Sequence, residues 1–110
     1  MDGSKAIQEM NKAYQARQKG NEGMARVLAR RAAGLSIREY LKRNNVDQEG
    51  LSLNDLLKNQ DIRKHLPITS YAALDRLSTR IGEDFSFPSD FDLILDSKNV
   101  VDQLSINLGA

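Results

Sequence analysis

Apolar residues recur every three or four positions along most of the chain, which is the spacing that gives a helix one apolar face. In the first such segment, from about Ser4 to Lys19, Ile7, Met10 and Tyr14 share that face. A serine is suited to cap the start of a helix, and the glycine after Lys19 is suited to end it. The pattern therefore predicts a first helix over this segment.

A second helix is predicted to begin almost at once, with Asn21 as its N-cap, and to run to about Asn44. Because the connection is so short, the two helices should form an antiparallel hairpin. On a helical wheel the second segment is apolar over two broad arcs, with Arg31, Arg38 and Lys42 in a narrow wedge between them. A helix that is apolar nearly all round is buried between neighbours. We therefore expect a central helix whose wedge alone reaches solvent.

Small residues are frequent in the same segment, among them Ala25, Ala29, Ala32 and Gly34. A glycine in the middle of a helix costs ~1 kcal/mol relative to alanine. Small side chains let another backbone approach closely. A tight contact at Gly34 would therefore account for the glycine.

The rest of the chain predicts shorter helices followed by another long one. Residues 52–66 should form one or two short helices, in which Ser52 and Asp55 have the spacing of a capping box. Further helices are expected over residues 69–81 and 89–107. The expected fold is all-α, a single domain built as an antiparallel helical bundle of three long helices plus one to two short ones.

Composition limits the class of protein without identifying a function. There are no cysteines, which excludes disulfides and thiolate metal sites and is typical of a reducing compartment. No apolar run approaches the ~20 residues that span a bilayer, and the N-terminus lacks the apolar core of a signal peptide. We therefore expect a soluble, cytoplasmic protein that does not enter a membrane.

The formal net charge of +1 conceals a gradient along the chain. Residues 1–45 contain ten lysines and arginines against four acids, whereas residues 81–110 contain one lysine against six acids. Such asymmetry is typical either of a basic face for nucleic acid or of two halves that neutralise each other in the fold. The counts alone leave both interpretations open.

The central helix carries all the candidate anion- or RNA-binding residues, which are Arg26, Arg30, Arg31, Arg38 and Lys42. In one interpretation, Arg31 and Arg38 pair with Asp92 and Asp96, which lie one turn apart on the last helix and face away from its apolar stripe. In the other, the basic residues form a strip for phosphate, which suits the forked donors of arginine. Internal pairing is preferred, because surface charge usually serves solvation or local pairing and the chain has no tryptophan for base stacking.

No catalytic or metal-binding motif stands out. His65 is the only histidine, and spacing identifies no serine or cysteine partner for it. The acids of residues 83–96 lack the glycine and the full ligand spacing of a calcium loop. We predict no catalytic residue, no metal site and no cofactor.

Three segments together resemble the HEPN superfamily of small bacterial helical bundles: ARVLARRAAGLSIREYL, YAALDRLSTRI and FPSDFDLILDSKNVVDQL. Many members of that superfamily are RNA-cleaving toxins with an Arg-x(4–6)-His motif. Here residues 58–60, where that arginine would stand, read KNQ. Lys58 has an allowed spacing to His65 but is not arginine, so the nuclease activity is not implied. The resemblance implies a helical bundle, dimerisation and a possible partner protein.

Two functions follow from these observations. The preferred one is a non-enzymatic protein-interaction module that forms a homodimer and acts through protein contacts. The alternative is an RNA- or nucleotide-binding bundle that uses the basic ridge of the helix over residues 22–44. Nucleic acid is the less favoured partner, for the reasons given above.

Overall fold

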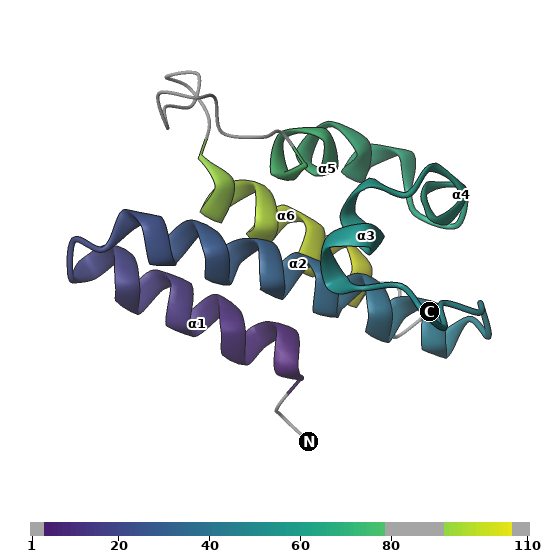
Figure 1. Cartoon of the computed structure of the whole chain (residues 1–110), viewed down its shortest axis with the longest axis horizontal. Coiled ribbons are helices and arrows are strands. Elements are labelled where there is room, and N and C mark those ends of the chain that lie inside the picture. Colours follow the sequence, from purple (N-terminus) through teal and green to yellow (C-terminus); the bar gives the residue numbers. More distant parts are fainter. Residues whose placement is uncertain (1–3, 79–91, 107–110) are drawn as a thin grey trace.

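The computed structural model describes residues 4–78 and 92–106, and this part of the chain contains helices and turns but no strand (Figure 1). The prediction of an all-α fold is confirmed for these residues. The elements are α1 (Lys5–Gln18), α2 (Glu22–Arg43), α3 (Leu53–Lys58), α4 (Gln60–Arg63), the 3₁₀ turn η1 (Ile68–Ser70), α5 (Tyr71–Leu77) and α6 (Leu93–Ile106). The predictions of a helix over residues 69–81 and of another starting at Ser89 or Asp90 are too long, because α5 ends at Leu77 and α6 begins at Leu93; the predicted end near Asn107 lies outside the described residues.

Side-chain caps define the first two helices at the residues that the sequence indicated. The Ser4 hydroxyl accepts a hydrogen bond from the backbone N–H of Ile7, at 3.1 Å. The Asn21 side chain accepts one from the N–H of Met24, at 3.2 Å. Gly20 has a φ of +81°, the left-handed conformation that ends helices and that glycine adopts without steric cost. The predicted bounds of both helices are confirmed, and α1 and α2 lie side by side in opposite directions (Figure 1).

The helix α3 lies across α2 at the glycine that was expected to allow close packing. A Cβ atom built on Gly34 would lie 2.8 Å from the Cβ atom of Leu53 and 2.9 Å from its carbonyl oxygen. The predicted capping box at the start of α3 is present, with Ser52 and Asp55 each accepting from the backbone N–H of the other. The glycine therefore marks the point where the backbone of α3 approaches α2.

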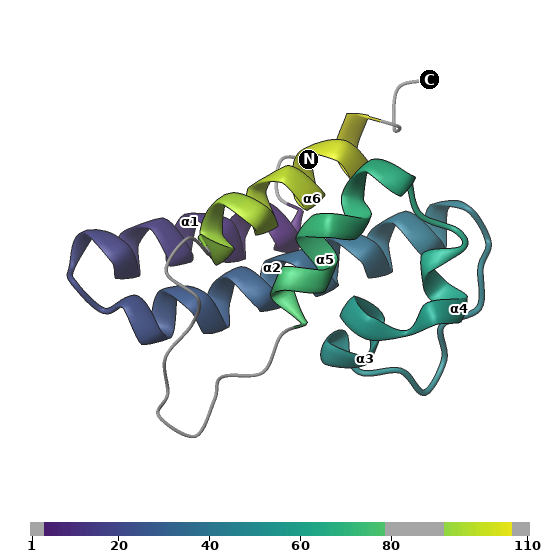
Figure 2. The same ribbon diagram turned by 90° about the horizontal axis from the view of Figure 1, so that it is seen from above.

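The last helix runs in the same direction as α2 and opposite to α1, so the antiparallel bundle of three long helices that the sequence predicts is not confirmed. Early in α6, the Ser97 hydroxyl donates to the carbonyl oxygen of Ala29 at 2.6 Å. Near its end, the Leu104 carbonyl accepts from the guanidinium of Arg43 at 3.1 Å. The second contact lies nearer the C-terminal end of both helices than the first, so α2 and α6 are parallel. The reason is that α5 returns the chain from the end of α2 toward its beginning before α6 starts (Figure 2).

The core consists of two clusters, and α2 belongs to both. One is large and aliphatic and joins α2 to α3, α5 and α6; it includes Ile37, Leu41, Leu56, Leu74 and Leu104, each at most 1% exposed. The other joins α1, α2 and α6 and is built mainly from alanines, among them Ala13, Ala25, Ala29 and Ala32. Alanines bring the axes of α1 and α2 close together. The prediction of a central α2 is confirmed by its place in both clusters.

An ion network joins the ends of α1 and α2 to the start of α6. The guanidinium of Arg17 lies 2.6 Å from a carboxylate oxygen of Glu22 and 3.0 Å from one of Asp92. The hydrogen bonds from Arg17 hold the pKa values of both carboxyls below their usual range. Asp92 also accepts from the backbone N–H groups of Ile94 and Leu95, and so caps α6.

Replacing Arg17 with methionine should therefore make stability less dependent on pH. A carboxyl whose pKa is lowered in the fold stabilises it fully above its unfolded pKa of about 4. That stabilisation is lost as the pH falls through the lower folded pKa. All three side chains are more than a third exposed, so solvent screening limits the loss at pH 7 to about 0.5 kcal/mol. Urea unfolding of the unmodified protein and of Arg17→Met at pH 7 and pH 2.5 tests this. If their free energies of unfolding differ by the same amount at both pH values, the prediction is wrong.

Within the described ranges, no helix has both the length and the apolar character needed to cross a membrane. The longest, α2, carries six lysine and arginine side chains.

Candidate nucleic-acid or protein interface

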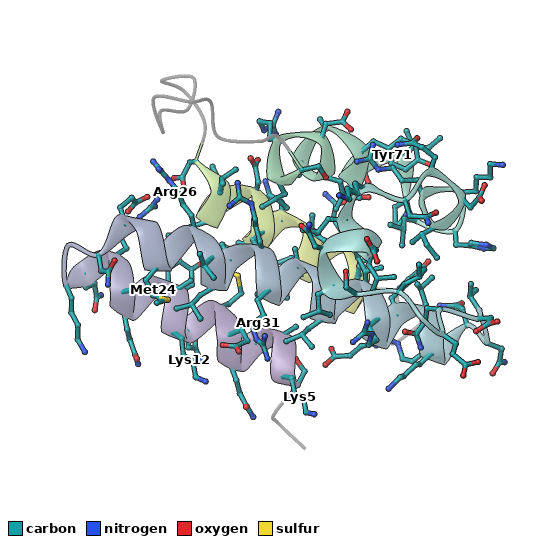
Figure 3. All side chains as sticks on the ribbon, viewed as in Figure 1. Lys5, Lys12, Met24, Arg26, Arg31 and Tyr71 are labelled. Carbon is teal, nitrogen blue, oxygen red and sulfur yellow. The ribbon has the colours of Figure 1, made fainter. Side chains whose placement is uncertain are left out.

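The five basic residues predicted as a candidate site do not form one strip. Arg31, Arg38 and Lys42 lie on the outer side of α2, within the wedge that the helical wheel placed toward solvent. Arg26 and Arg30 lie on another side of the helix. Figure 3 shows Arg26 at the edge of α2 remote from α1, and Arg31 on the side where α1 lies. The basic ridge is thus divided between two surfaces.

Arg26 and Arg30 each have a partner within the protein. The Nε atom of Arg30 donates to the carbonyl oxygen of Leu77 at 3.0 Å, which ties α2 to the end of α5. Burial of the Arg30 guanidinium, together with the nearby charge of Arg26, lowers the pKa of Arg30. Arg26 lies 3.9 Å from a carboxylate oxygen of Glu22, one turn earlier in the helix. These contacts use donors that a phosphate would need.

Arg31 and Arg38 are engaged too, but not by the residues that the sequence suggested. Arg31 donates from Nε to a carboxylate oxygen of Glu9 at 2.7 Å. Arg38 donates from Nε to the side-chain oxygen of Gln48 at 3.0 Å and from Nη2 to the carbonyl oxygen of Leu51. Of the five candidates, Lys42 is the one that has no polar partner among the described residues.

The expected partners, Asp92 and Asp96, bind other arginines. Asp92 pairs with Arg17, and Asp96 forms two hydrogen bonds of 2.9 Å with Arg76 of α5. Asp96 is also buried rather than facing solvent, because α6 packs against α5 on the side that the wheel left exposed. The prediction of internal neutralisation thus names the wrong pairs.

A double-mutant cycle on free energies of unfolding should show that Arg31 pairs with Glu9. We expect a coupling of about 1 kcal/mol between Arg31→Ala and Glu9→Ala, since the Glu9 side chain is 12% exposed and its partner lies at the surface. The matched cycle between Arg31→Ala and Asp96→Ala should give no coupling, because Asp96 is held by Arg76. The reverse order of the two couplings would contradict the assignment.

The structure gathers a different set of basic residues in an open groove between α1 and α2. Its volume is about 430 Å³, and its lining combines charged, polar and apolar side chains: Lys5, Gln8, Glu9, Lys12, Arg31, Leu35, Arg38 and Leu53. Four of these residues are basic and one is acidic. Lys5 and Lys12 were not predicted, because their approach to Arg31 depends on how α1 pairs with α2. Their seven-residue spacing on one face of a hairpin helix is the signal that was available in the sequence.

Exposed apolar side chains continue from this groove along α2 toward the hairpin turn. Met24 is 47% exposed and Val27 is 56% exposed. Val27 also lines a second, smaller hollow between α2 and α3, and that hollow shares Arg31 and Leu53 with the groove. The helical wheel has Val27 in one of the two apolar arcs that were predicted to be buried, so the prediction that the wedge alone reaches solvent is wrong. Val27 is exposed because α3 covers α2 at Gly34, two turns further along, and does not extend back to Val27.

The side chains that catalysis or metal binding would require do not gather at this groove. His65 is exposed, in the turn after the four-residue helix α4. In residues 4–78 and 92–106, no three His, Asp or Glu side chains are grouped so that they could hold a metal ion.

Comparison with protein-family models, curated proteins and solved structures finds no match for this chain. A helical fold is compatible with many functions, so function has to be argued from the surface itself.

Proposed function

We propose that the chain is a non-enzymatic protein-interaction module that binds its partner on one face of the α1–α2 hairpin. We call this the hairpin face and define it as the groove described above together with Met24 and Val27. One observation supports it most: large apolar side chains lie exposed beside a groove in which four basic residues face a single carboxylate, that of Glu9. Apolar surface rimmed by polar residues is typical of protein interaction sites.

The shape of the hairpin face favours a protein over a small molecule. Small-molecule sites have volumes of roughly 300–1,000 Å³ but enclose most of the ligand within mainly apolar walls. The groove falls within that size range, yet it is open and its lining is mostly charged or polar. An extended partner surface can use both the groove and the exposed apolar residues beside it.

The contacts of the arginines make RNA the weaker candidate. Arg30, Arg31 and Arg38 already donate to protein oxygens. Phosphate binding would have to replace these hydrogen bonds. Within the described residues, the apolar side chains of the hairpin face are aliphatic, whereas binding of single-stranded RNA usually relies on aromatic side chains that stack on bases.

Charge also bears on whether the partner is a second copy of this chain. Two copies related by a two-fold axis through the hairpin face would bring the same basic residues together, which costs energy. A partner of different sequence with negative charge avoids that cost. The HEPN-like resemblance and the homodimer that it implies therefore remain predictions. The absence of cysteine favours an intracellular setting for such a partner.

Quantitative affinity purification with a surface variant tests the proposal. Met24→Ser/Val27→Ser removes exposed apolar side chains from the hairpin face, whereas Ile68→Ser/Leu95→Ser removes exposed apolar side chains elsewhere. All four residues are exposed, so both variants should fold. We expect a partner protein whose recovery falls about tenfold with the first variant and is unchanged with the second.

Two other results would count against the proposal. The same recovery with both variants would mean that the hairpin face is not used. Binding of a single-stranded RNA at ~50 mM salt that weakens steeply with salt and with Arg31→Ala/Arg38→Ala would favour the RNA-binding function instead.

A further inference from the structure

Two stripes of side chains run side by side along the hairpin face, and each has the spacing of a coiled-coil seam. On α1 the stripe consists of Lys5, Glu9, Lys12 and Ala16, and on α2 of Met24, Leu28, Arg31, Leu35 and Arg38. Successive residues are three or four positions apart in both. Two adjacent helices with this spacing form a groove into which the side chains of a third helix can pack.

We propose that the occupant of the hairpin face is a single acidic amphipathic helix from another protein. This inference rests on the proposed function and adds the chemistry of the partner. The face extends over residues 24–38 of α2, which at about 1.5 Å per residue corresponds to roughly 21 Å, or about four helical turns. A partner helix of about 15 residues matches that length.

The acidic character of the partner follows from the charges that the fold leaves exposed. Arg31 is paired with Glu9, and Arg38 donates to uncharged oxygens of Gln48 and Leu51. Lys5 is exposed and has no polar partner within the described ranges. The amine of Lys12 lies 3.7 Å from Glu9, and its side chain is 62% exposed. One carboxylate thus faces four basic groups, so the groove retains positive charge.

The apolar character of the partner follows from the other end of the face. Met24 is 47% exposed, and Leu28 and Ala16 are partly buried against the alanine-rich core cluster. A helix laid along the face would cover these side chains at the hairpin turn and reach the basic groups toward the start of α1. The partner helix therefore has apolar residues in one half and glutamate or aspartate in the other.

Selection from a displayed library of helical peptides tests this chemistry without knowledge of the partner. The peptides have about 16 residues, and the positions on one helix face vary among Leu, Glu, Lys and Gln. We expect the selected peptides to have Leu at spacings of three and four in one half, Glu in the other half, and few Lys. A synthetic peptide of the selected sequence should bind more weakly as salt is raised.

Charge reversal provides the decisive control. Lys5→Glu/Lys12→Glu changes two exposed side chains of the groove and should invert the preference from Glu to Lys. Lys58→Glu/Lys64→Glu makes the same change in charge on exposed residues of the α3–α4 region and should leave it unaltered. Selected peptides that do not favour Glu, or a preference that Lys5→Glu/Lys12→Glu does not change, would overturn the proposal.

The outcome is distinguishable from failure of the proposed function. If the hairpin face captures a protein in the purification experiment but the library yields neutral or basic peptides, the face binds a partner of other chemistry and this inference is wrong. A dimer seen by light scattering that Met24→Ser/Val27→Ser abolishes would also overturn it, because a second copy would then be the occupant.

Discussion

Replacing Arg76 with methionine is expected to lower the free energy of unfolding by about 3 kcal/mol. Arg76 makes two hydrogen bonds, each of 2.9 Å, with the carboxylate of Asp96. The Asp96 side chain is 7% exposed, and no other side chain among the described residues is seen to neutralise it. Without the guanidinium, a carboxylate would remain buried without a counter-charge. Urea unfolding followed by circular dichroism gives the change in free energy.

A second variant separates the ion pair from simple loss of packing. Because a buried ion pair can often be replaced by apolar residues at little cost, Arg76→Met/Asp96→Leu should recover most of the stability lost by Arg76→Met. If the double variant is as unstable as the single one, the loss comes from packing of the Arg76 side chain. If Arg76→Met alone costs less than about 1 kcal/mol, the pair is no more than a surface salt bridge.

Replacing Gly34 with alanine is expected to destabilise the protein, although alanine is the better helix former. In an open helix this substitution would gain about 1 kcal/mol. Here the new Cβ atom would lie 2.8 Å from the Cβ atom of Leu53, 2.9 Å from its carbonyl oxygen and 3.2 Å from its Cα atom. Two of these three atoms belong to the backbone of α3, so no side-chain rotation removes the contact. We expect a net loss of about 1–3 kcal/mol.

Gly23 provides a matched control in the same helix. A Cβ atom at Gly23 would meet no atom within 4 Å, so Gly23→Ala should stabilise the protein by up to about 1 kcal/mol. Opposite signs for the two substitutions in thermal unfolding are the predicted result. A gain in stability from Gly34→Ala would show that α3 does not approach α2 as closely as described.

Local signals in the sequence were sufficient for the hairpin and its central helix. Caps at Ser4 and Asn21 depend on residues within one turn, and the stop at Gly20 depends on a single backbone conformation. The close contact at Gly34 was also predictable, because a glycine in mid-helix needs a reason to be there. None of these features requires knowledge of which distant elements pack together.

The ion pairs and the binding face could not be predicted, because they depend on the packing of distant elements. Arg31 meets Glu9 only because α1 and α2 pair in one particular register. Asp96 is buried because α5 lies beside α6 and supplies Arg76. The helical wheel counted Val27 as buried, since it shows apolar character but not how far α3 extends along α2. Such residues become assignable only once the helices are placed.

Docking of a partner protein on the hairpin face is tested most directly by photo-crosslinking from Val27. The chain is produced in its native cells with a photoreactive phenylalanine analogue at Val27, or at Ile68 as a control that is 78% exposed on another element. We predict one protein adduct of defined mass from Val27, weakened by Lys5→Glu/Lys12→Glu and absent from Ile68. Adducts from Val27 that are no more abundant or specific than those from Ile68 would contradict a docking role for the hairpin face.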